Sequence, residues 1–234
     1  MSTNERILTP FTLPNGTELK NRLLMAPMTT CTGYYDGTVT SELVEYYRAR
    51  SGSIGTIIVE CCFVDDLGLA FPGAIGIDND EKIAGLAKIA EAIKSKGSKA
   101  LLQIYHGGRM VDPKLIGGRT PVGPSAVAAP RDGAATPVAL TTEEVEGMIG
   151  KFGEAVRRAI QAGFDGVEIH GANTYLIQQF YSPNSNQRDD EWGGSRDNRA
   201  RFPLAVLDIT HKMVRQYADD AFIIGYRFSP EELE

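Results

Sequence analysis

The chain is poor in cysteine, histidine and tryptophan, with three, three and one of these residues among 234. Cys61 and Cys62 are adjacent and Cys31 stands alone, so the cysteines form no disulfide framework and match no standard zinc spacing. We predict no metal site, and we interpret the adjacent pair as small buried apolar residues. Cys31 follows a strand in a polar loop, which leaves a reactive thiol beside a ligand open. The acidic cluster 189–191 is interpreted as an internally paired loop.

Long apolar runs and clusters of basic residues are also missing. No stretch approaches the roughly 20 apolar residues that a membrane-spanning helix needs, and the polar start at Asn4, Glu5 and Arg6 predicts no signal segment. The 24 basic residues are dispersed and outnumbered by 30 acidic ones, which disfavours binding to nucleic acid or to anionic membranes. We expect a cytoplasmic globular protein that binds a small-molecule substrate. Its association into a homo-oligomer stays open.

What the sequence does contain is an alternation of strand-like and helical segments. The clearest helix begins after Thr141, whose capping-box partner is Glu144, and its apolar stripe reaches Ile160 before Gly163. Short runs rich in Ile, Val and Leu predict strands. The predicted strands are 22–27, 56–62, 99–106, 164–170 and 221–227, and the other predicted helices cover 40–49, 83–93 after the N-cap candidate Asn79, and about 195–213 from Ser195.

This alternation predicts a parallel sheet, either open and doubly wound or closed into an eight-fold barrel. Long loops, 107–140 and 171–194, follow the carboxyl ends of strands, as in barrels whose sites are built from βα loops, although open sheets share this feature. No Gly-x-Gly-x-x-Gly motif follows the first strand, which argues against a dinucleotide-binding fold. An α/β TIM (β/α)8 barrel fits these features with only about the first five βα units present, although a closed barrel requires eight strands and the open sheet stays possible at this point. It forms one domain, 1–234, incomplete at its C-terminal end.

A histidine, an asparagine and a tyrosine follow the fourth predicted strand. Val167 and Ile169 alternate along it, His170 ends it, and Asn173 and Tyr175 follow three and five residues after the histidine. Because the carboxyl ends of parallel strands meet in one crevice, these polar groups can meet a substrate there. The spacing predicts an active site. His106, at the end of another predicted strand, is interpreted as structural.

Further motifs accompany this set along nearly the whole chain. They are Leu19-Lys20-Asn21-Arg22, Met25-Ala26-Pro27-Met28, Gln103 with His106-Gly107-Gly108-Arg109, His170-Gly171-Ala172-Asn173-Thr174-Tyr175-Leu176, Gln179-Phe180-Tyr181-Ser182-Pro183, Asn186, Arg188, Asp190, Gly193-Gly194-Ser195, Asn198-Arg199-Ala200-Arg201-Phe202 and Gly225-Tyr226-Arg227-Phe228-Ser229-Pro230. Together they closely resemble the old yellow enzyme family, whose members are FMN-dependent NAD(P)H oxidoreductases on an eight-fold α/β barrel. The resemblance covers the N-terminal part of that family's barrel, and its last three βα units are absent from this sequence.

The resemblance implies a flavin site built first from one loop. Ala26, Pro27, Met28 and Thr29 would lie under the isoalloxazine ring, with Thr29 able to hydrogen-bond flavin O4 and so tune its electron affinity. Many relatives have cysteine at that position. Without the resemblance, Pro27 would be taken simply to end a strand and Thr29 to solvate a turn.

Three other strand residues would complete the FMN site by the same resemblance. The backbone at Cys61 would touch the ring, and the Gln103 amide would hydrogen-bond the pyrimidine edge. Arg227 would stabilise the anionic reduced flavin near N1. Taken alone, a strand glutamine would more simply satisfy neighbouring backbone, and an arginine at a strand end would be paired or solvated.

The resemblance also assigns roles to the histidine motif. His170 and Asn173 would donate hydrogen bonds to the carbonyl oxygen of an α,β-unsaturated substrate, and hydride from the flavin would reach its β-carbon. The same two donors would stabilise the developing enolate, an oxyanion-hole role. Tyr175 would give the proton to the α-carbon, whereas its simpler interpretation is an aromatic residue packing under the loop.

The function expected from the resemblance is an FMN-dependent oxidoreductase, an ene-reductase that takes hydride from NADH or NADPH and passes it to an activated alkene. One alternative is a truncated, catalytically incompetent barrel fragment that acts only as part of an assembly. Another is a different flavin task at the same site, such as demethylation or dienoyl reduction. The choice between NADH and NADPH and the physiological substrate are not readable from these motifs.

Overall fold

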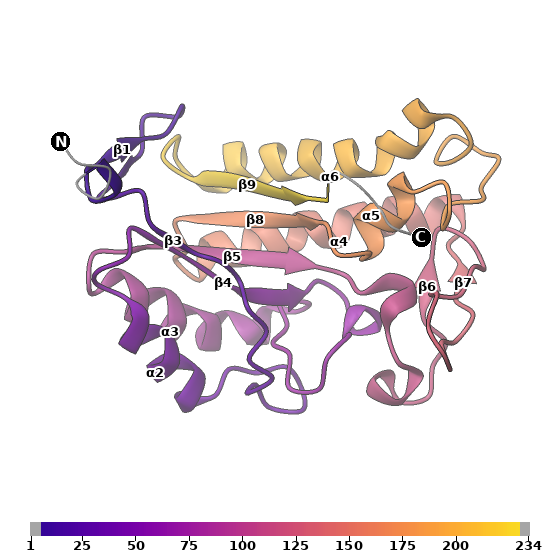
Figure 1. Ribbon diagram of the computed structural model, residues 1–234, viewed down its shortest axis with the longest axis horizontal. Helices are drawn as coiled ribbons and strands as arrows, with labels where there is room; N and C mark the ends of the chain where they lie inside the picture. The colour runs from indigo at the N-terminus through magenta and orange to yellow at the C-terminus, as the bar shows by residue number, and fades with distance from the viewer. Residues whose placement is uncertain (1–5, 230–234) are drawn as a thin grey trace.

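The computed structural model describes residues 6–229, and its centre is a parallel sheet whose strands lie side by side (Figure 1). The sheet has five strands in the order β3-β4-β5-β8-β9. Neighbours in the sheet are therefore successive along the chain, which is the order of the first five strands of a TIM barrel. The strands are β3 Leu24–Met25, β4 Thr56–Phe63, β5 Lys99–Tyr105, β8 Gly166–Gly171 and β9 Ile223–Phe228.

In the described residues, four long helices connect these strands, and three of them begin at a side-chain cap. Thr141 forms the predicted capping box with Glu144 at the third helix, and the hydroxyl groups of Thr40 and Ser195 cap the first and the last. Asn79 caps a short 3-10 turn, η2 Asp80–Lys82, that runs directly into the following helix. The helices are α2 Ser41–Arg50, α3 Ile83–Lys94, α4 Thr142–Gln161 and α6 Arg196–Tyr217.

The sequence predicted too long a first strand and did not predict the short elements. The predicted strand 22–27 shrinks to β3, because among the described residues it pairs only with β4, at Leu24 and Met25. Elements of two to six residues carry too little periodicity to be read from sequence. The missed elements are β1 Phe11–Thr12, β2 Glu18–Leu19, η1 Asp66–Gly68, η3 Gly108–Met110, η4 Pro113–Ile116, β6 Val122–Gly123, β7 Val138–Ala139 and α5 Leu176–Tyr181.

The two faces of the sheet differ in character. On the outer face, alternate residues such as Leu102, Ile104 and Val167 pack against the helices in the main apolar core. The inner face is apolar at the amino ends, where Leu101 and Ile58 form a small cluster with residues of the N-terminal hairpin β1–β2. The inner positions nearer the carboxyl ends are occupied by polar and aromatic side chains. They include Gln103, Tyr105, Glu168, His170 and Arg227.

Exposed apolar side chains flank both outer strands. Leu24 and Met28 are 55% and 62% exposed beside β3, and Leu204 and Phe228 are 56% and 68% exposed beside β9. An apolar cavity of about 560 Å³ lies between β9, α5 and α6. In the described part of the chain, β3 and β9 do not pair with each other, so the sheet is an open part of a barrel. No helix of the described residues is long and apolar enough to cross a membrane.

Candidate active site

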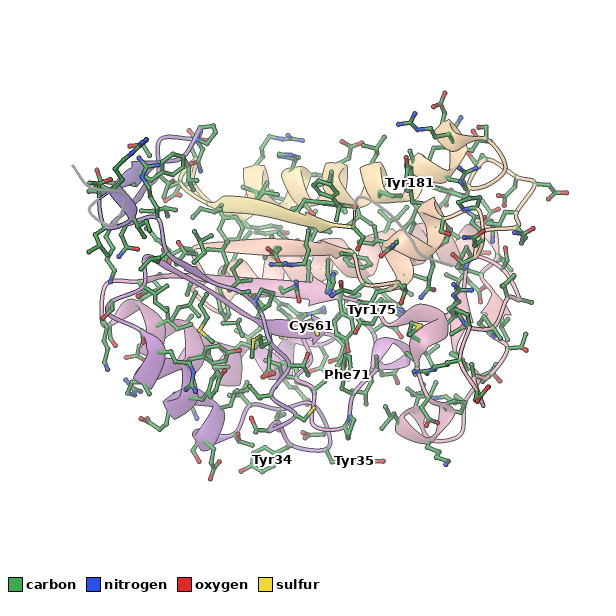
Figure 2. The ribbon with its side chains drawn as sticks, in the orientation of Figure 1. Tyr34, Tyr35, Cys61, Phe71, Tyr175 and Tyr181 are labelled. Carbon is green, nitrogen blue, oxygen red and sulfur yellow. The ribbon has the colours of Figure 1, made fainter. Side chains whose placement is uncertain are left out.

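A polar concavity of about 100 Å³ lies at the carboxyl ends of the sheet strands. All of the predicted site residues except Ala26 and Met28 line it. Figure 2 shows two of them, Cys61 and Tyr175, close to the carboxyl ends of β4 and β8, with Phe71 beside them. The larger apolar cavity lies on the other side of β9 and contains none of these residues. The lining residues are Pro27, Thr29, Cys61, Gln103, His170, Asn173, Tyr175 and Arg227.

His170 is a neutral hydrogen-bond donor in this setting. Burial, together with the nearby Arg227 cation, lowers the pKa of its imidazole to about 4. The backbone N–H of Ala172 donates to His170 Nδ1 at 3.4 Å. Nδ1 is therefore the acceptor nitrogen, and the proton of the neutral ring resides on Nε2. The imidazole can donate a hydrogen bond from Nε2 to a ligand oxygen throughout the neutral pH range.

The next residues form a strained loop. Asn173 and Thr174 have φ values of 56° and 61°, a left-handed conformation that is uncommon outside glycine and unusual for a β-branched residue. Such strain costs on the order of 1–3 kcal/mol per residue and persists only where the surroundings enforce it. Here Thr174 N–H donates to Gln178 Oε1 at 2.7 Å, and Gln179 Nε2 donates to the Thr174 carbonyl at 2.7 Å. The two glutamines hold the loop that carries Asn173.

Gln179 also joins this loop to the one after β5. Its Nε2 donates to the Gly107 carbonyl at 3.1 Å, and its Oε1 accepts from the Arg109 N–H at 3.0 Å. Gly108, at φ 59°, permits the approach, since a Cβ there would lie 2.2 Å from Gln179 Oε1. The sequence reading quoted Gln179 among the motifs but gave neither glutamine a role, and the available signal was an adjacent polar pair in an otherwise apolar stretch beside the histidine motif.

Tyr175 lies against His170 in an aromatic cluster. Its ring centroid is 5.0 Å from that of His170, 5.3 Å from that of Tyr105 and 6.3 Å from that of Phe71. Burial, with a further contribution from Cys61, raises the pKa of the Tyr175 phenol well above its ordinary value. The phenol therefore keeps its proton at neutral pH and is available as an acid.

The loop after β3 is anchored by a buried carboxylate. Thr29 Oγ1 lies 3.4 Å from Cys61 Sγ, and burial raises the pKa of that thiol to about 11. Cys61 is thus a neutral thiol rather than a nucleophilic thiolate. Glu60, which is fully buried, accepts hydrogen bonds from the backbone N–H and the hydroxyl of Thr30. Glu60 was not recognised from sequence.

A second buried carboxylate, that of Glu168, connects Gln103 and Arg227, two of the predicted flavin-binding residues. Gln103 Nε2 donates to Glu168 Oε1 at 2.7 Å, and Arg227 Nε donates to the same oxygen at 2.8 Å. The strand register explains the contact between Gln103 and Glu168, because Gln103 on β5 is the register partner of Glu168 on β8. Glu168 was also missed by sequence reasoning, because a Val-Glu-Ile strand does not reveal which polar neighbours the sheet brings to it.

Two other sequence interpretations concern residues outside the concavity lining. His106 is buried, its Nδ1 accepts from the Gly108 N–H at 3.0 Å, and its carbonyl accepts from the Leu176 N–H at 3.0 Å, in keeping with a structural role. Asp190 pairs with Arg188 in the expected internally bonded loop. Within the described residues, no group of three or more His, Cys, Asp or Glu side chains could hold a metal ion.

The donor set fits the reactive part of a flavin ring. The amide of Gln103, the guanidinium of Arg227, the hydroxyl of Thr29 and the neutral imidazole of His170 line one concavity. These groups suit the isoalloxazine ring, which has N–H and carbonyl groups at one end and a redox centre that faces the substrate. Ala26 and Met28, which alternate with the lining residues Pro27 and Thr29, are exposed. A concavity of about 100 Å³ is smaller than FMN, so it has room for only one part of the ring system.

Fold and site together define part of a TIM barrel with a polar concavity at the carboxyl ends of its strands. The sequence model of the NADH:flavin oxidoreductase / NADH oxidase family matches residues 6–234, and the chain belongs to this family. FMN is accordingly its cofactor, as the resemblance to old yellow enzymes implied.

Several relatives share long segments with the chain. It is 89% identical over 234 residues to the NADH:fumarate oxidoreductase of Klebsiella pneumoniae (strain 342), covering 100% of this chain and 25% of that protein. It is 61% identical to the NADH:acrylate oxidoreductase of Vibrio harveyi, covering 94% and 22%. It is 41% identical to the NADPH dehydrogenase of Bacillus subtilis (strain 168), covering 87% and 59%. The chain thus spans about a quarter of the length of the first two.

Solved structures show the same arrangement. Morphinone reductase in complex with tetrahydroNAD is 34% identical with a TM-score of 0.86, and the match covers 96% of this chain and 64% of that one. A 2-naphthoyl-CoA reductase in complex with 2-naphthoyl-CoA is 30% identical with a TM-score of 0.89, covering 95% and 35%. These matches confirm the expected barrel fold, of which this chain is a part.

Proposed function

We propose that this chain carries the site of an FMN-dependent oxidoreductase that takes hydride from NAD(P)H and passes it to an activated alkene. The observation that carries the proposal is the placement of His170, Asn173 and Tyr175 on the same concavity as Gln103 and Arg227. Bound FMN would supply the two-electron chemistry, receiving hydride from the nicotinamide and donating it to the acceptor. Gln103, Arg227 and Thr29 would hold its ring.

His170 and Asn173 would bind and polarise the oxygen of the acceptor. The neutral imidazole offers its Nε2 proton, and the strained loop holds the backbone of Asn173, which lines the same concavity. Two donors on one oxygen withdraw electrons from the conjugated double bond and stabilise the negative charge that develops there. Removal of one such donor typically costs about 3 kcal/mol in the transition state.

Tyr175 would protonate the acceptor at the carbon next to its carbonyl group. Its raised pKa keeps the proton in place until that carbon becomes basic. Tyr105 and Phe71 pack edge to face against the Tyr175 ring and limit its movement. Proton transfer would then come from one defined side.

Replacement of Tyr175 by Phe tests this role, because the ring is retained and only the acidic proton is lost. In the holoprotein we expect reduction of an activated alkene to slow by about 10²- to 10⁴-fold, as for the loss of a general acid. Reduction of bound FMN by NADH should stay within a factor of two. Unchanged rates in both half-reactions would show that Tyr175 is not the acid.

A second function is favoured by the lengths of the relatives. The two whose names specify fumarate and acrylate are matched over only 25% and 22% of their length, whereas the NADPH dehydrogenase is matched over 59%. The long relatives therefore contain far more sequence than a barrel of this kind requires. In such a protein, this barrel would oxidise NADH, and the unsaturated carboxylate would be reduced elsewhere. The Tyr175→Phe variant would then reduce the alkene at the normal rate.

A barrel fragment that acts only as part of an assembly is a further alternative. It is favoured by the exposed apolar side chains beside both outer strands, such as Leu24 and Phe228. The visible absorbance of the purified chain after addition of FMN and removal of the excess distinguishes the alternatives. A retained flavin band supports an enzyme site in this chain, and a colourless protein supports dependence on further sequence or on a partner.

A further inference from the structure

A buried carboxylate lies in the polar layer on the inner face of the sheet. The side chain of Glu168 is 10% exposed and lies between Gln103 on β5 and Arg227 on β9, strands that flank β8 (Figure 1). TIM-barrel interiors are filled mainly by branched apolar side chains, and burial of an unpaired carboxylate is costly. Glu168 is tolerated because three hydrogen bonds reach it, two from Arg227 and one from Gln103.

The carboxylate fixes the orientation of the Gln103 amide. An ionised carboxylate only accepts hydrogen bonds, so it selects the Nε2 end of the amide, which lies 2.7 Å from Glu168 Oε1. The carbonyl end, Oε1, is then left for the concavity that Gln103 lines. A ligand with an N–H group at this point meets an acceptor of fixed position.

The same carboxylate fixes the Arg227 guanidinium and offsets its charge. Arg227 donates from Nε to Glu168 Oε1 at 2.8 Å and from Nη2 to Oε2 at 3.3 Å, a two-point contact that holds the plane of the group. Nη1 takes no part in the contact and remains for a ligand. The pair as a whole is close to neutral, so the concavity presents an oriented guanidinium without a full net positive charge.

We infer that Glu168 is the positioning residue of the flavin site: it orients the Gln103 amide and the Arg227 guanidinium, and its charge weakens binding of anionic reduced FMN relative to oxidised FMN. This inference rests on the proposed flavin function. Neutralising the carboxylate at constant shape should leave Arg227 uncompensated, and the site should then favour the reduced cofactor.

The Glu168→Gln holoprotein tests the charge, with FMN as the probe. The readouts are the dissociation constants of oxidised and reduced FMN and the midpoint potential of the bound cofactor. We expect the ratio of the two constants to change by about tenfold in favour of reduced FMN, which for a two-electron couple is about 30 mV more positive. The matched control is Asp165→Asn, a carboxylate-to-amide change at the opposite end of the same strand, where Asp165 accepts from the Ala100 N–H.

The Glu168→Asp variant tests positioning, because it keeps the charge but shortens the reach to Gln103 and Arg227. We expect about tenfold weaker binding of FMN in both redox states, with their ratio unchanged. This variant also decides the matter if Glu168→Gln does not fold. Wild-type behaviour of both variants, or a Glu168→Gln shift toward oxidised FMN, would overturn the inference. A wild-type holoprotein that binds no FMN would instead overturn the proposed function on which it rests.

Discussion

Gln179 joins the two loops of the site, and its replacement by Met should uncouple them. The side chain is fully buried and makes three hydrogen bonds to backbone groups of Gly107, Arg109 and Thr174. Methionine has a similar length but cannot make these bonds, so three buried backbone groups lose a partner. Each such loss costs about 1–3 kcal/mol, and with partial relaxation we expect a total of about 3 kcal/mol in the free energy of unfolding.

The catalytic effect of Gln179→Met should be selective. Without its tie to Gln179, the left-handed backbone at Asn173 and Thr174 can relax, and the Asn173 carboxamide moves away from His170. We expect alkene reduction to slow at least tenfold, while reduction of bound FMN by NADH stays within a factor of two.

Urea unfolding and stopped-flow absorbance of each half-reaction measure these effects. Gln187→Met is the matched control, because Gln187 is exposed and its side chain makes one hydrogen bond, to the Pro183 carbonyl. The control should change stability by no more than about 0.5 kcal/mol. If Gln179→Met loses no more stability than the control, or if both half-reactions slow equally, Gln179 does not hold the loop as described.

Three other predictions concern stability. Burial lowers the pKa values of His106 and His170 to about 4, below the ordinary 6.5, so the native state binds fewer protons than the unfolded state. The free energy of unfolding should therefore be at its full value above pH 6.5 and fall by a few kcal/mol as the pH drops toward 4. A free energy of unfolding in urea that does not change between pH 7 and 5 would contradict this. Thr141→Ala removes the capping box of α4 and should lower the free energy of unfolding by about 1 kcal/mol, measured by thermal unfolding. An unchanged melting temperature would contradict this. Gly166→Ala places a Cβ 2.3 Å from the Ile223 carbonyl and should cost about 3 kcal/mol, whereas Gly150→Ala, in open space on α4, should gain about 0.5–1 kcal/mol. Equal effects of the two glycine changes would show that β8 and β9 do not approach as closely as described.

Long periodic segments were predictable from sequence, and the site was predictable in part. The α4 capping box and its apolar stripe gave the helix bounds directly, because these signals are local. The parallel order of the strands followed from their alternation with helices. The first strand was overestimated, because strand length depends on the partners that the sheet supplies.

The supporting residues of the site were not predictable in the same way. His170, Asn173 and Tyr175 could be identified from their spacing in the sequence. The role of Glu168 could not, because it depends on Gln103 and Arg227, which β5 and β9 place beside it. Such contacts join residues about 60 positions apart in sequence. Tertiary contacts of this kind leave no periodic signal in a single sequence.

The affinity of the protein for FMN, with and without the two side chains proposed to hold the flavin ring, is the measurement that decides whether this concavity is a flavin site. Fluorescence titration of wild type, Gln103→Leu and Arg227→Leu with FMN gives the dissociation constants. We expect about tenfold or greater weakening in each variant, since each loses a polar contact worth about 1.5 kcal/mol or more. Affinities equal to that of the wild type in both variants would show that FMN does not bind at the carboxyl ends of these strands.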